Sequence, residues 1–177
     1  MKTLYRMRDI NRTQRGFTLI ELLIAIAITA LVGSAVATGV YQIVKVNASS
    51  TNRQVAIAQV QNATNSISRD AQQAQQIFPA SANFLSGESL TLQWTTWENH
   101  FHVVTYDLLG TSLRRTITID SGAPSTTIVA NSITAASVKW YTAMKVLDFT
   151  VLTATVGTGP AQRSETRTFQ INPRSAQ

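Results

Sequence analysis

The most informative ionisable residue of this chain is an acid inside an apolar segment. Glu21 lies near the start of a run from Phe17 to Val46 whose only other charged residue is Lys45. A charged side chain costs about 2.5–3.5 kcal/mol at the centre of a bilayer and less near the interface. Because of that cost, an acid in such a position usually has a function. Glu21 is therefore the first candidate for a functional site.

The other ionisable residues do not form a pattern that is typical of catalysis. His100 and His102 share a face if they lie on a strand, with Glu98 just before them, but strand histidines are far more often surface or half-buried residues than metal ligands. No nucleophile elbow or glycine-rich phosphate loop frames the serines and aspartates. Asp120 opens an Asp-Ser-Gly sequence, which is more typical of a turn than of a calcium loop. We predict no enzyme activity, no catalytic residue, no metal and no cofactor.

Aromatic and basic residues raise the alternative of a nucleic-acid surface. We expect four aromatic residues in the core or at its edge: Trp94, Trp97, Trp140 and Tyr141. The alternative is that they form a stacking platform for DNA, with Arg114 and Arg115 nearby. Adjacent residues on a strand point to opposite faces, so these two arginines do not form one patch. We therefore expect no nucleic-acid partner.

The positive charge of the chain is concentrated at its start. The 177 residues carry a formal net charge of +6. Five basic residues and one acid put +4 of it into the first sixteen residues, which leaves +2 for the rest. These six residues are Lys2, Arg6, Arg8, Arg12, Arg15 and Asp9. The pattern indicates a basic leader rather than a basic protein. Cysteine is absent, which excludes disulfides, thiolate zinc sites and cysteine nucleophiles.

The apolar run is long enough to cross a membrane. No charge lies between Leu22 and Val44, and a helix of this length spans a hydrocarbon layer of ~30 Å. The basic residues before it favour a cytoplasmic N-terminus, so that everything after Lys45 lies outside. A plain signal anchor accounts for these features but not for Glu21. A secretory signal peptide, cut after Ala37, is a second alternative. Glu21 is out of place in that case too, and no turn-forming residue precedes the small-x-small triplet at 35–37.

The first residues of the run follow a specific pattern. From Arg15 to Leu23 the sequence reads RGFTLIELL, in which a glycine, a phenylalanine and a glutamate open an apolar helix. This segment resembles the cleavage and methylation motif of type IV prepilins and of the pseudopilins of type II secretion. The resemblance implies that a membrane-embedded aspartic peptidase cuts after Gly16 and then N-methylates the new terminal residue, Phe17. Glycine suits the position before the cut because a residue without Cβ lets the backbone extend in a tight active site.

The resemblance also implies a role for Glu21 in assembly. Its carboxylate would meet the terminal amine of a neighbouring subunit and set the axial register. Such pairing relieves the cost of an isolated ammonium and an isolated carboxylate near hydrocarbon. The alternative is that Glu21 only extends towards the lipid headgroups. Small residues along the same helix would permit close approach of neighbouring helices. They are Ala25, Ala27, Ala30, Gly33, Ser34, Ala35, Ala37 and Gly39.

The helix is predicted to continue beyond the membrane. Seven residues at spacings of three and four indicate an amphipathic stripe. They are Ile57, Val60, Thr64, Ile67, Ala71, Ala74 and Phe78. Pro79 is expected to end the helix, which would then have about 60 residues and a length of about 90 Å. The small alanine and threonine positions favour packing against a sheet over a coiled coil.

After Pro79 the apolar pattern changes to a period of two. We predict strands over residues 90–94, 100–107, 113–119, 127–130, 138–141, 146–156 and 165–171. Residues 157–160 are predicted to form the hairpin loop between the last two strands. The expected fold is therefore α+β, with a long N-terminal helix packed against a mostly antiparallel sheet. The resemblance implies the same pilin-like architecture.

Three segments and one function follow from these predictions. We expect a removed leader at 1–16, a transmembrane and assembly helix at 17–45, and an extracytoplasmic pilin-like domain at 46–177. The resemblance implies a structural subunit, a minor pilin or pseudopilin, of a type IV pilus-like or type II secretion filament. Its location would be the cytoplasmic (inner) membrane, crossed once, and then the filament. The implied partners are a prepilin peptidase and N-methyltransferase, other pilin or pseudopilin subunits, the inner-membrane assembly platform and, before assembly, membrane lipid.

Two alternatives from other classes stay open. The first is a binding module, an adhesin or a DNA-uptake subunit, that the same anchor displays on a filament. The second is a soluble exported domain that is released after Ala37, with Thr38 as its first residue.

Overall fold

A single helix leads from the apolar run into the region of strands. The computed structural model describes residues 16–173, so residues 1–15 of the predicted leader lie outside the described part of the chain. Helix α1 extends without interruption from Leu19 to Gln73, a length of 55 residues. The chain divides into two compact units after Val44. The prediction of one long N-terminal helix is confirmed.

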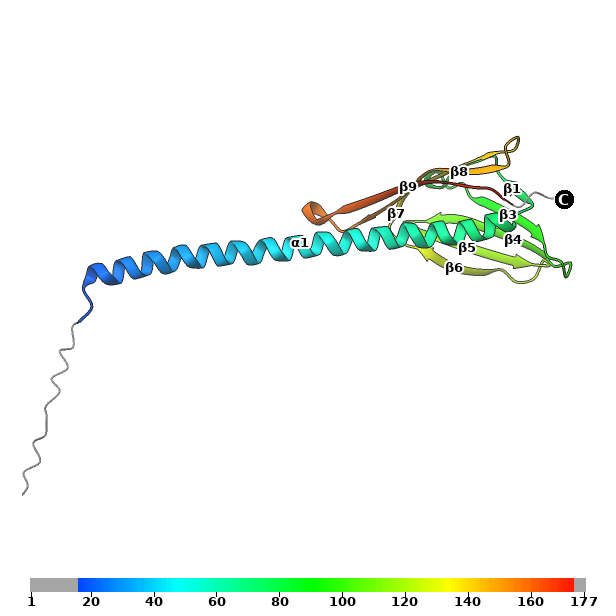
Figure 1. Ribbon diagram of the computed structural model, residues 1–177. Helices are drawn as coiled ribbons and strands as arrows, with labels where there is room; N and C mark the ends of the chain where they lie inside the picture. Colours follow the sequence, from blue (N-terminus) through cyan, green and yellow to red (C-terminus); the bar gives the residue numbers. More distant parts are fainter. Residues whose placement is uncertain (1–15, 174–177) are drawn as a thin grey trace, which may run out of the picture. The chain divides into compact units, whose positions relative to one another are not determined.

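Two antiparallel sheets account for most of the second unit (Figure 1). Sheet A has the strand order β1-β3-β4-β5-β6, and sheet B has the order β2-β7-β8-β9. The strands of sheet A are β1 (Gln76–Phe78), β3 (Leu90–Thr95), β4 (Phe101–Leu109), β5 (Ser112–Ile119) and β6 (Ser125–Ala130). Those of sheet B are β2 (Ser81–Asn83), β7 (Ile133–Tyr141), β8 (Val146–Val156) and β9 (Arg163–Ile171). Two short 3-10 helices, η1 (Phe84–Ser86) and η2 (Gly159–Ala161), complete the unit.

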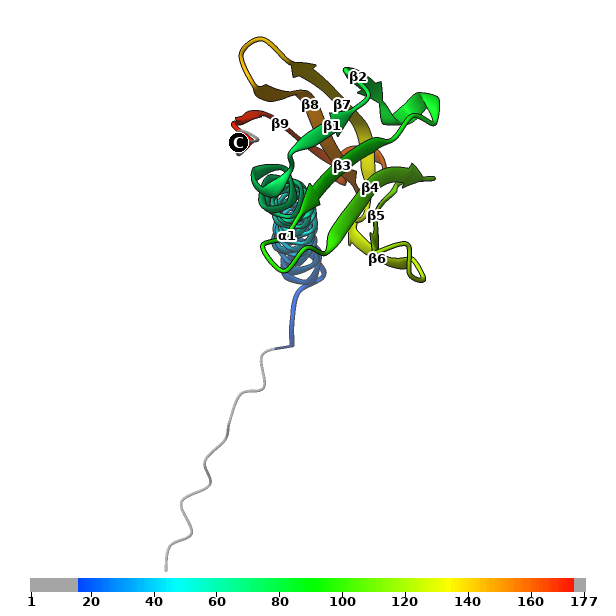
Figure 2. The same ribbon diagram turned by 90° about the vertical axis from the view of Figure 1, so that its right-hand side faces the viewer.

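The part of α1 that belongs to this unit packs through small and medium apolar residues. Its fully buried apolar residues are Ala56, Val60, Ala63, Ile67 and Ala71. The spacing of three and four keeps them on one face, and the alanines let the backbone of the helix approach its neighbours closely. One hydrophobic cluster joins this face to residues of both sheets, and Figure 2 shows the helix end-on beside them. The predicted α+β class is confirmed, with two sheets where the sequence suggested one.

A buried polar network also fixes α1 to sheet A. Asp70 is 4% exposed. Its carboxylate accepts hydrogen bonds from Arg115 Nε at 2.6 Å and from the hydroxyl of Tyr106 at 2.5 Å. That hydroxyl also lies 3.0 Å from the hydroxyl of Ser66. Burial and the bond to Asp70 raise the pKa of Tyr106, and the bond to Asp70 raises the pKa of Arg115. The buried charges are therefore paired and hydrogen-bonded.

The end of α1 differs from the prediction. The helix ends at Gln73 and does not reach Pro79, because the next residues pair with sheet A. The backbone N–H of Gln75 donates to the carbonyl of Gln93 at 2.8 Å, and Gln76–Phe78 then forms β1 against β3. Phe78 was predicted in the buried stripe of the helix. It lies instead in β1 and is 51% exposed.

The other differences concern strand bounds and one tryptophan. Strand β2 was not predicted, and β7 begins five residues before the predicted residue 138. The hairpin of β8 and β9 lies where it was expected. Trp94 and Trp140 contribute to the core or pack against it, as predicted. Trp97 does not: it is 92% exposed, because it lies in the turn between β3 and β4 rather than on either strand.

Candidate processing and assembly site

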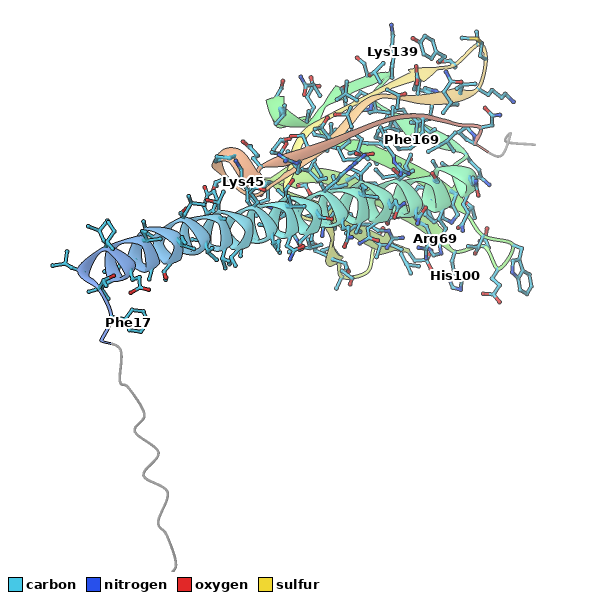
Figure 3. All side chains as sticks on the ribbon, turned by 60° about the vertical axis from the view of Figure 1, so that its left-hand side comes forward. Phe17, Lys45, Arg69, His100, Lys139 and Phe169 are labelled. Carbon is cyan, nitrogen blue, oxygen red and sulfur yellow. The ribbon has the colours of Figure 1, made fainter. Side chains whose placement is uncertain are left out.

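The predicted cleavage position lies immediately before the helix. Gly16, Phe17 and Thr18 have no regular secondary structure, and α1 begins at Leu19. Phe17 is 84% exposed, and Figure 3 shows its side chain in the segment before the first helical turn. Among residues 16–173, no atom outside the neighbouring residues lies within 4 Å of the place where a Cβ on Gly16 would stand. The bond between Gly16 and Phe17 is thus in an open, non-helical segment.

Thr18 and Glu21 cap the start of α1 reciprocally. The backbone N–H and the hydroxyl of Thr18 both donate to Oε2 of Glu21, at 3.0 and 2.9 Å. In return, the backbone N–H of Glu21 donates to the hydroxyl oxygen of Thr18 at 3.3 Å. This arrangement is a capping box, which satisfies backbone N–H groups that have no partner within the helix. It also holds a negative charge at the positive end of the helix dipole.

Thr18 is a site residue that the sequence analysis did not single out. The signal was present, since a threonine followed three residues later by a glutamate, just before an apolar run, is the sequence pattern of a capping box. All hydrogen bonds recorded for the Glu21 carboxylate in the described chain go to Oε2. Oε1 is therefore left with acceptor capacity for a group outside the chain.

The helix that follows is apolar on every side. Its large apolar residues are exposed without exception from Leu19 to Val46. Such a helix is typical of a membrane span rather than of the surface of a soluble domain. Within the described residues, α1 is the one helix that is long and apolar enough to cross a membrane. Lys45, labelled in Figure 3, is the first charged residue after Glu21.

The hydroxyl groups of Thr29, Ser34 and Thr38 are satisfied within the helix. The hydroxyl of Thr29 donates to the carbonyl of Ala25 at 2.7 Å, and that of Thr38 donates to the carbonyl of Ser34 at 2.9 Å. The hydroxyl of Ser34 in turn donates to the carbonyl of Leu31 at 2.8 Å. These bonds let hydroxyl groups enter hydrocarbon without an unpaired donor. Glu21, by contrast, keeps one carboxylate oxygen that an external partner can still engage.

The other candidate residues do not come together into a site. His100 lies outside β4, where its Nδ1 donates to Asp120 at 2.5 Å, whereas His102 stacks on Trp94 with ring centroids 5.3 Å apart. Asp120 also accepts the backbone N–H of Phe101 at 2.7 Å. The bond from His100 and then the bond from Phe101 lower the pKa of Asp120. In residues 16–173 no three histidine, aspartate or glutamate side chains are grouped as metal ligands.

The two adjacent arginines bind different acids on opposite faces of sheet A. Arg114 pairs with Asp107, its cross-strand neighbour on β4. Arg115 pairs with Asp70 on the side of the sheet where α1 packs. The prediction that these two arginines do not form one basic patch is confirmed.

A comparison with known protein families places a motif over the same N-terminal residues. The family model of the prokaryotic N-terminal methylation motif matches residues 11–37. This motif, together with the long apolar helix at the N-terminus, fits a type IV prepilin-like protein. No curated protein and no solved structure was found to match the chain.

The matched segment includes every residue of the candidate site. It covers Gly16, Phe17, Thr18 and Glu21, together with the apolar helix up to Ala37. A prepilin motif implies processing by a prepilin peptidase and assembly with other pilin subunits. An apolar helix at this position is consistent with an inner-membrane anchor.

Proposed function

We propose that this chain is a structural subunit, a minor pilin or pseudopilin, of a type IV pilus-like or type II secretion filament. In this proposal the precursor is cut after Gly16, Phe17 is N-methylated, and the mature chain assembles through its N-terminal helix. The observation that carries the proposal is the match of the methylation motif to residues 11–37, which include the cap and first turns of an apolar helix that contains Glu21. Such a subunit would be an interaction protein without catalysis of its own.

The local geometry supports a cut between Gly16 and Phe17. Proteases act on extended backbone, and this bond lies in an exposed segment outside α1. The alternative cut after Ala37 does not have this support, because Ala37 lies in the interior of a continuous helix. A signal peptidase would have to unwind α1 to reach that bond. We therefore favour removal of sixteen residues over release of a soluble domain.

The charge pattern supports the proposed orientation. The net +4 of the first sixteen residues would hold the N-terminus in the cytoplasm before the cut. The cytoplasmic side is also where the bond after Gly16 would meet the peptidase. Residues after Lys45 would then lie outside the membrane and form the extracytoplasmic pilin-like domain. The basic leader is needed only until the helix is inserted, which is consistent with its later removal.

The capping box supports the proposed role of Glu21 in assembly. In the uncut chain Thr18 holds one carboxylate oxygen of Glu21 at the start of the helix, and the other oxygen can accept a further bond. The cut would create an ammonium group on Phe17 of a neighbouring subunit. An ammonium pairs well with a carboxylate that is already fixed, because little side-chain entropy is lost. The pair would set the axial position of one subunit against the next.

Two features favour a minor subunit or pseudopilin over a major pilin. In the family that this chain resembles, many major pilins close a C-terminal loop with a disulfide. A chain without cysteine cannot form that disulfide. The last two strands are instead joined by a simple hairpin, β8–β9. The work of assembly would come from a cytoplasmic ATPase and from the packing of the anchors.

Replacement of Glu21 tests the assembly role. In cells that build the filament, Glu21→Ala should be inserted and cut like the wild type, but its share in purified filaments should fall at least about tenfold, the effect of losing ~1.4 kcal/mol or more of pairing. Immunoblots of membranes and of sheared filaments measure both quantities. Thr29→Ala is the matched control, because it alters a polar residue of the same helix whose hydroxyl is bonded internally. Normal incorporation of Glu21→Ala would refute the pairing role.

A further inference from the structure

Two long strands, β6 and β9, form borders of the two sheets. Within residues 16–173, the backbone of β6 pairs with β5 alone and that of β9 pairs with β8 alone. The other two border strands, β1 and β2, have three residues each. A border strand presents unpaired N–H and C=O groups that can pair with another chain. Figure 2 shows β6 and β9 on different sides of the second unit.

Strand β6 has few of the features that usually shield a border strand. Those features are short length, charge, proline and bulges. β6 reads STTIVA from Ser125 to Ala130, without charge or proline, and its first four residues are exposed. One irregularity occurs in its pairing with β5, next to Leu113 and Arg114. Most of its outer edge is therefore open to another strand.

The contacts of α1 define the direction of β6. The backbone N–H of Asn131, directly after β6, donates to Gln59 at 2.6 Å. Thr127, earlier in β6, lies opposite Arg115, which binds Asp70 further along α1. β6 therefore runs back along α1, towards the end at which the chain enters the second unit.

Strand β9 runs in the opposite direction. It begins near Asn52 of α1, which donates to the carbonyl of Ala161 in the preceding loop. It ends opposite Leu147, and Leu147 also pairs with Trp140. The backbone N–H of Trp140 donates to the carbonyl of Ala80, which follows the end of α1 in the chain. β9 therefore runs away from the end at which the chain enters the unit, as Figure 1 shows.

These directions decide which strand can pair with β6 in a shared membrane. Two copies that are anchored in one membrane have their α1 helices pointing the same way. A strand of the second copy is then antiparallel to β6 only if it runs away from the membrane. β9 meets this condition, whereas β6 of the second copy would need a reversed anchor.

We propose that β6 of one copy of this chain pairs antiparallel with β9 of a neighbouring copy. Sheet A of the first copy then continues into sheet B of the second. The contact joins two different surfaces, and every copy carries both, so further copies can add on either side. β6 has no charged residue, so it meets Glu165 and Arg167 of β9 without repulsion between like charges.

The heights of the two strands along α1 also match. Gln59, beside the end of β6, lies seven residues after Asn52, beside the start of β9, or about 10 Å further along the helix. About three residues of strand cover that distance. The nearest register that keeps the exposed side chains of both strands on one face puts Ile128 opposite Thr168 of the next copy. Both residues are β-branched, which suits neighbouring strands.

The pairing depends on a shared membrane. A contact of one six-residue strand is much smaller than the ~1,200–2,000 Å² of a stable protein interface, so it would be weak between molecules that diffuse freely. Two chains held in one membrane by their apolar helices meet at a higher effective concentration. The inference goes beyond the proposed function, because it needs the anchor but neither the cut nor the filament.

Cysteine cross-linking in membranes tests the inference, because the chain has no cysteine of its own. Two differently tagged full chains, one with Ile128→Cys and one with Thr168→Cys, are produced together, and the membranes are oxidised with copper phenanthroline. Directly opposite residues of antiparallel strands are within disulfide range, so a mixed dimer is expected. Either variant produced alone should give no dimer. Thr150→Cys, exposed on the inner strand β8, takes the place of Thr168→Cys in the matched control and should give none.

A pair of charges tests the register. Thr126 and Gln170 lie opposite each other in the same register, and both are exposed. Thr126→Lys in one chain and Gln170→Lys in the other should lower the yield of the mixed dimer about fivefold, the effect of ~1 kcal/mol. Thr126→Lys with Gln170→Glu should restore the yield, because opposite charges then face each other. Unaltered thermal unfolding of the lysine variants would show that the loss is not due to misfolding.

Four results would overturn the inference. They are the absence of a mixed dimer, an equal yield from either variant alone or from the β8 control, a cross-link to a different protein only, and a yield that the Lys–Glu pair does not restore. Glu21→Ala chains should still cross-link, so this result is separate from that of the filament proposal.

Discussion

The two carboxylates of Glu21 and Asp70 are stabilised by different kinds of partner. Thr18 holds Glu21 from within the same helical turn, through two bonds to one of its oxygens. Asp70 is buried and is held by Arg115 and Tyr106, which lie 45 and 36 residues further along the chain. A local bond leaves Glu21 able to take another partner. The long-range bonds of Asp70 use both of its oxygens and tie the helix to the sheet.

Removal of the Asp70 carboxylate should destabilise the chain strongly. Asp70→Ala leaves the partly buried side chain of Arg115 without its counter-ion, and loss of one partner of a buried pair costs about 3–5 kcal/mol. Urea unfolding of the full chain in detergent, followed by the fluorescence of the core tryptophans, measures the change in the free energy of unfolding.

The neighbouring pair provides the control for this prediction. Asp107→Ala breaks the pair with Arg114, whose two side chains are about one-third exposed, and such pairs contribute about 0–1 kcal/mol. The two variants thus remove the same kind of group from adjacent arginines of β5. Equal losses of stability would mean that burial does not govern the strength of these pairs.

The candidate site can be proposed from the sequence alone, whereas the buried network cannot. The motif at Gly16, Phe17 and Glu21 is contiguous, so residue type and spacing were sufficient to single it out. The pairing of Asp70 with Arg115 joins a helix to a strand, and only the folded chain brings them together. Nothing in the sequence near Asp70 distinguishes it from a solvated acid.

At the scale of elements, local pattern predicted the strands well and the end of the helix poorly. Period-two apolar residues correspond to β3, β5, β8 and β9 within a few residues. The segment Gln76–Phe78 continued the helical spacing of apolar residues but pairs with β3 instead, because strand pairing satisfies its backbone groups after the helix ends. Tertiary pairing here outweighs a local helical pattern.

The loop between β8 and β9 is held against α1 by a contact that requires glycine. Asn52 Nδ2 donates to the carbonyl of Ala161 at 2.8 Å. Gly157 has a φ of +83°, and a Cβ at this position would clash with the side-chain amide of Asn52. Both the positive φ and the nearby amide of Asn52 therefore disfavour a side chain at this position.

A pair of glycine substitutions separates these two effects. Gly157→Ala should lower the free energy of unfolding by about 1–2 kcal/mol for the positive φ, and by a further ~1–3 kcal/mol for the clash. Gly87→Ala has nearly the same φ, +80°, and no atom within 4 Å, so it should show the first cost alone. In a chain that already carries Asn52→Ala, the cost of Gly157→Ala should fall close to that of Gly87→Ala, with the carbonyl oxygen of Ala161 at 3.3 Å as the remaining close contact. A cost that is unchanged in that background would show that Asn52 is not the obstacle.

At the scale of the whole molecule, the chain combines an apolar helical segment with an α+β unit that has its own core. The division after Val44 falls next to Lys45, the charge that ends the apolar run. Hydrophobicity and basic charge alone would suit a signal anchor or a secreted protein as well as a filament subunit. Glu21 in a capping box, within a methylation motif, favours the filament subunit.

The mass of the mature chain tests the central proposal most directly. The full precursor is produced in cells with an active prepilin peptidase, purified from membranes, and analysed by intact-mass and N-terminal peptide mass spectrometry. We predict a chain that begins at Phe17 and is heavier by one N-terminal methyl group. The Gly16→Val variant should stay at the mass of the precursor, because a β-branched side chain restricts the backbone before the cut. A wild-type chain that begins at Thr38, or that still begins at Met1, would contradict the proposal.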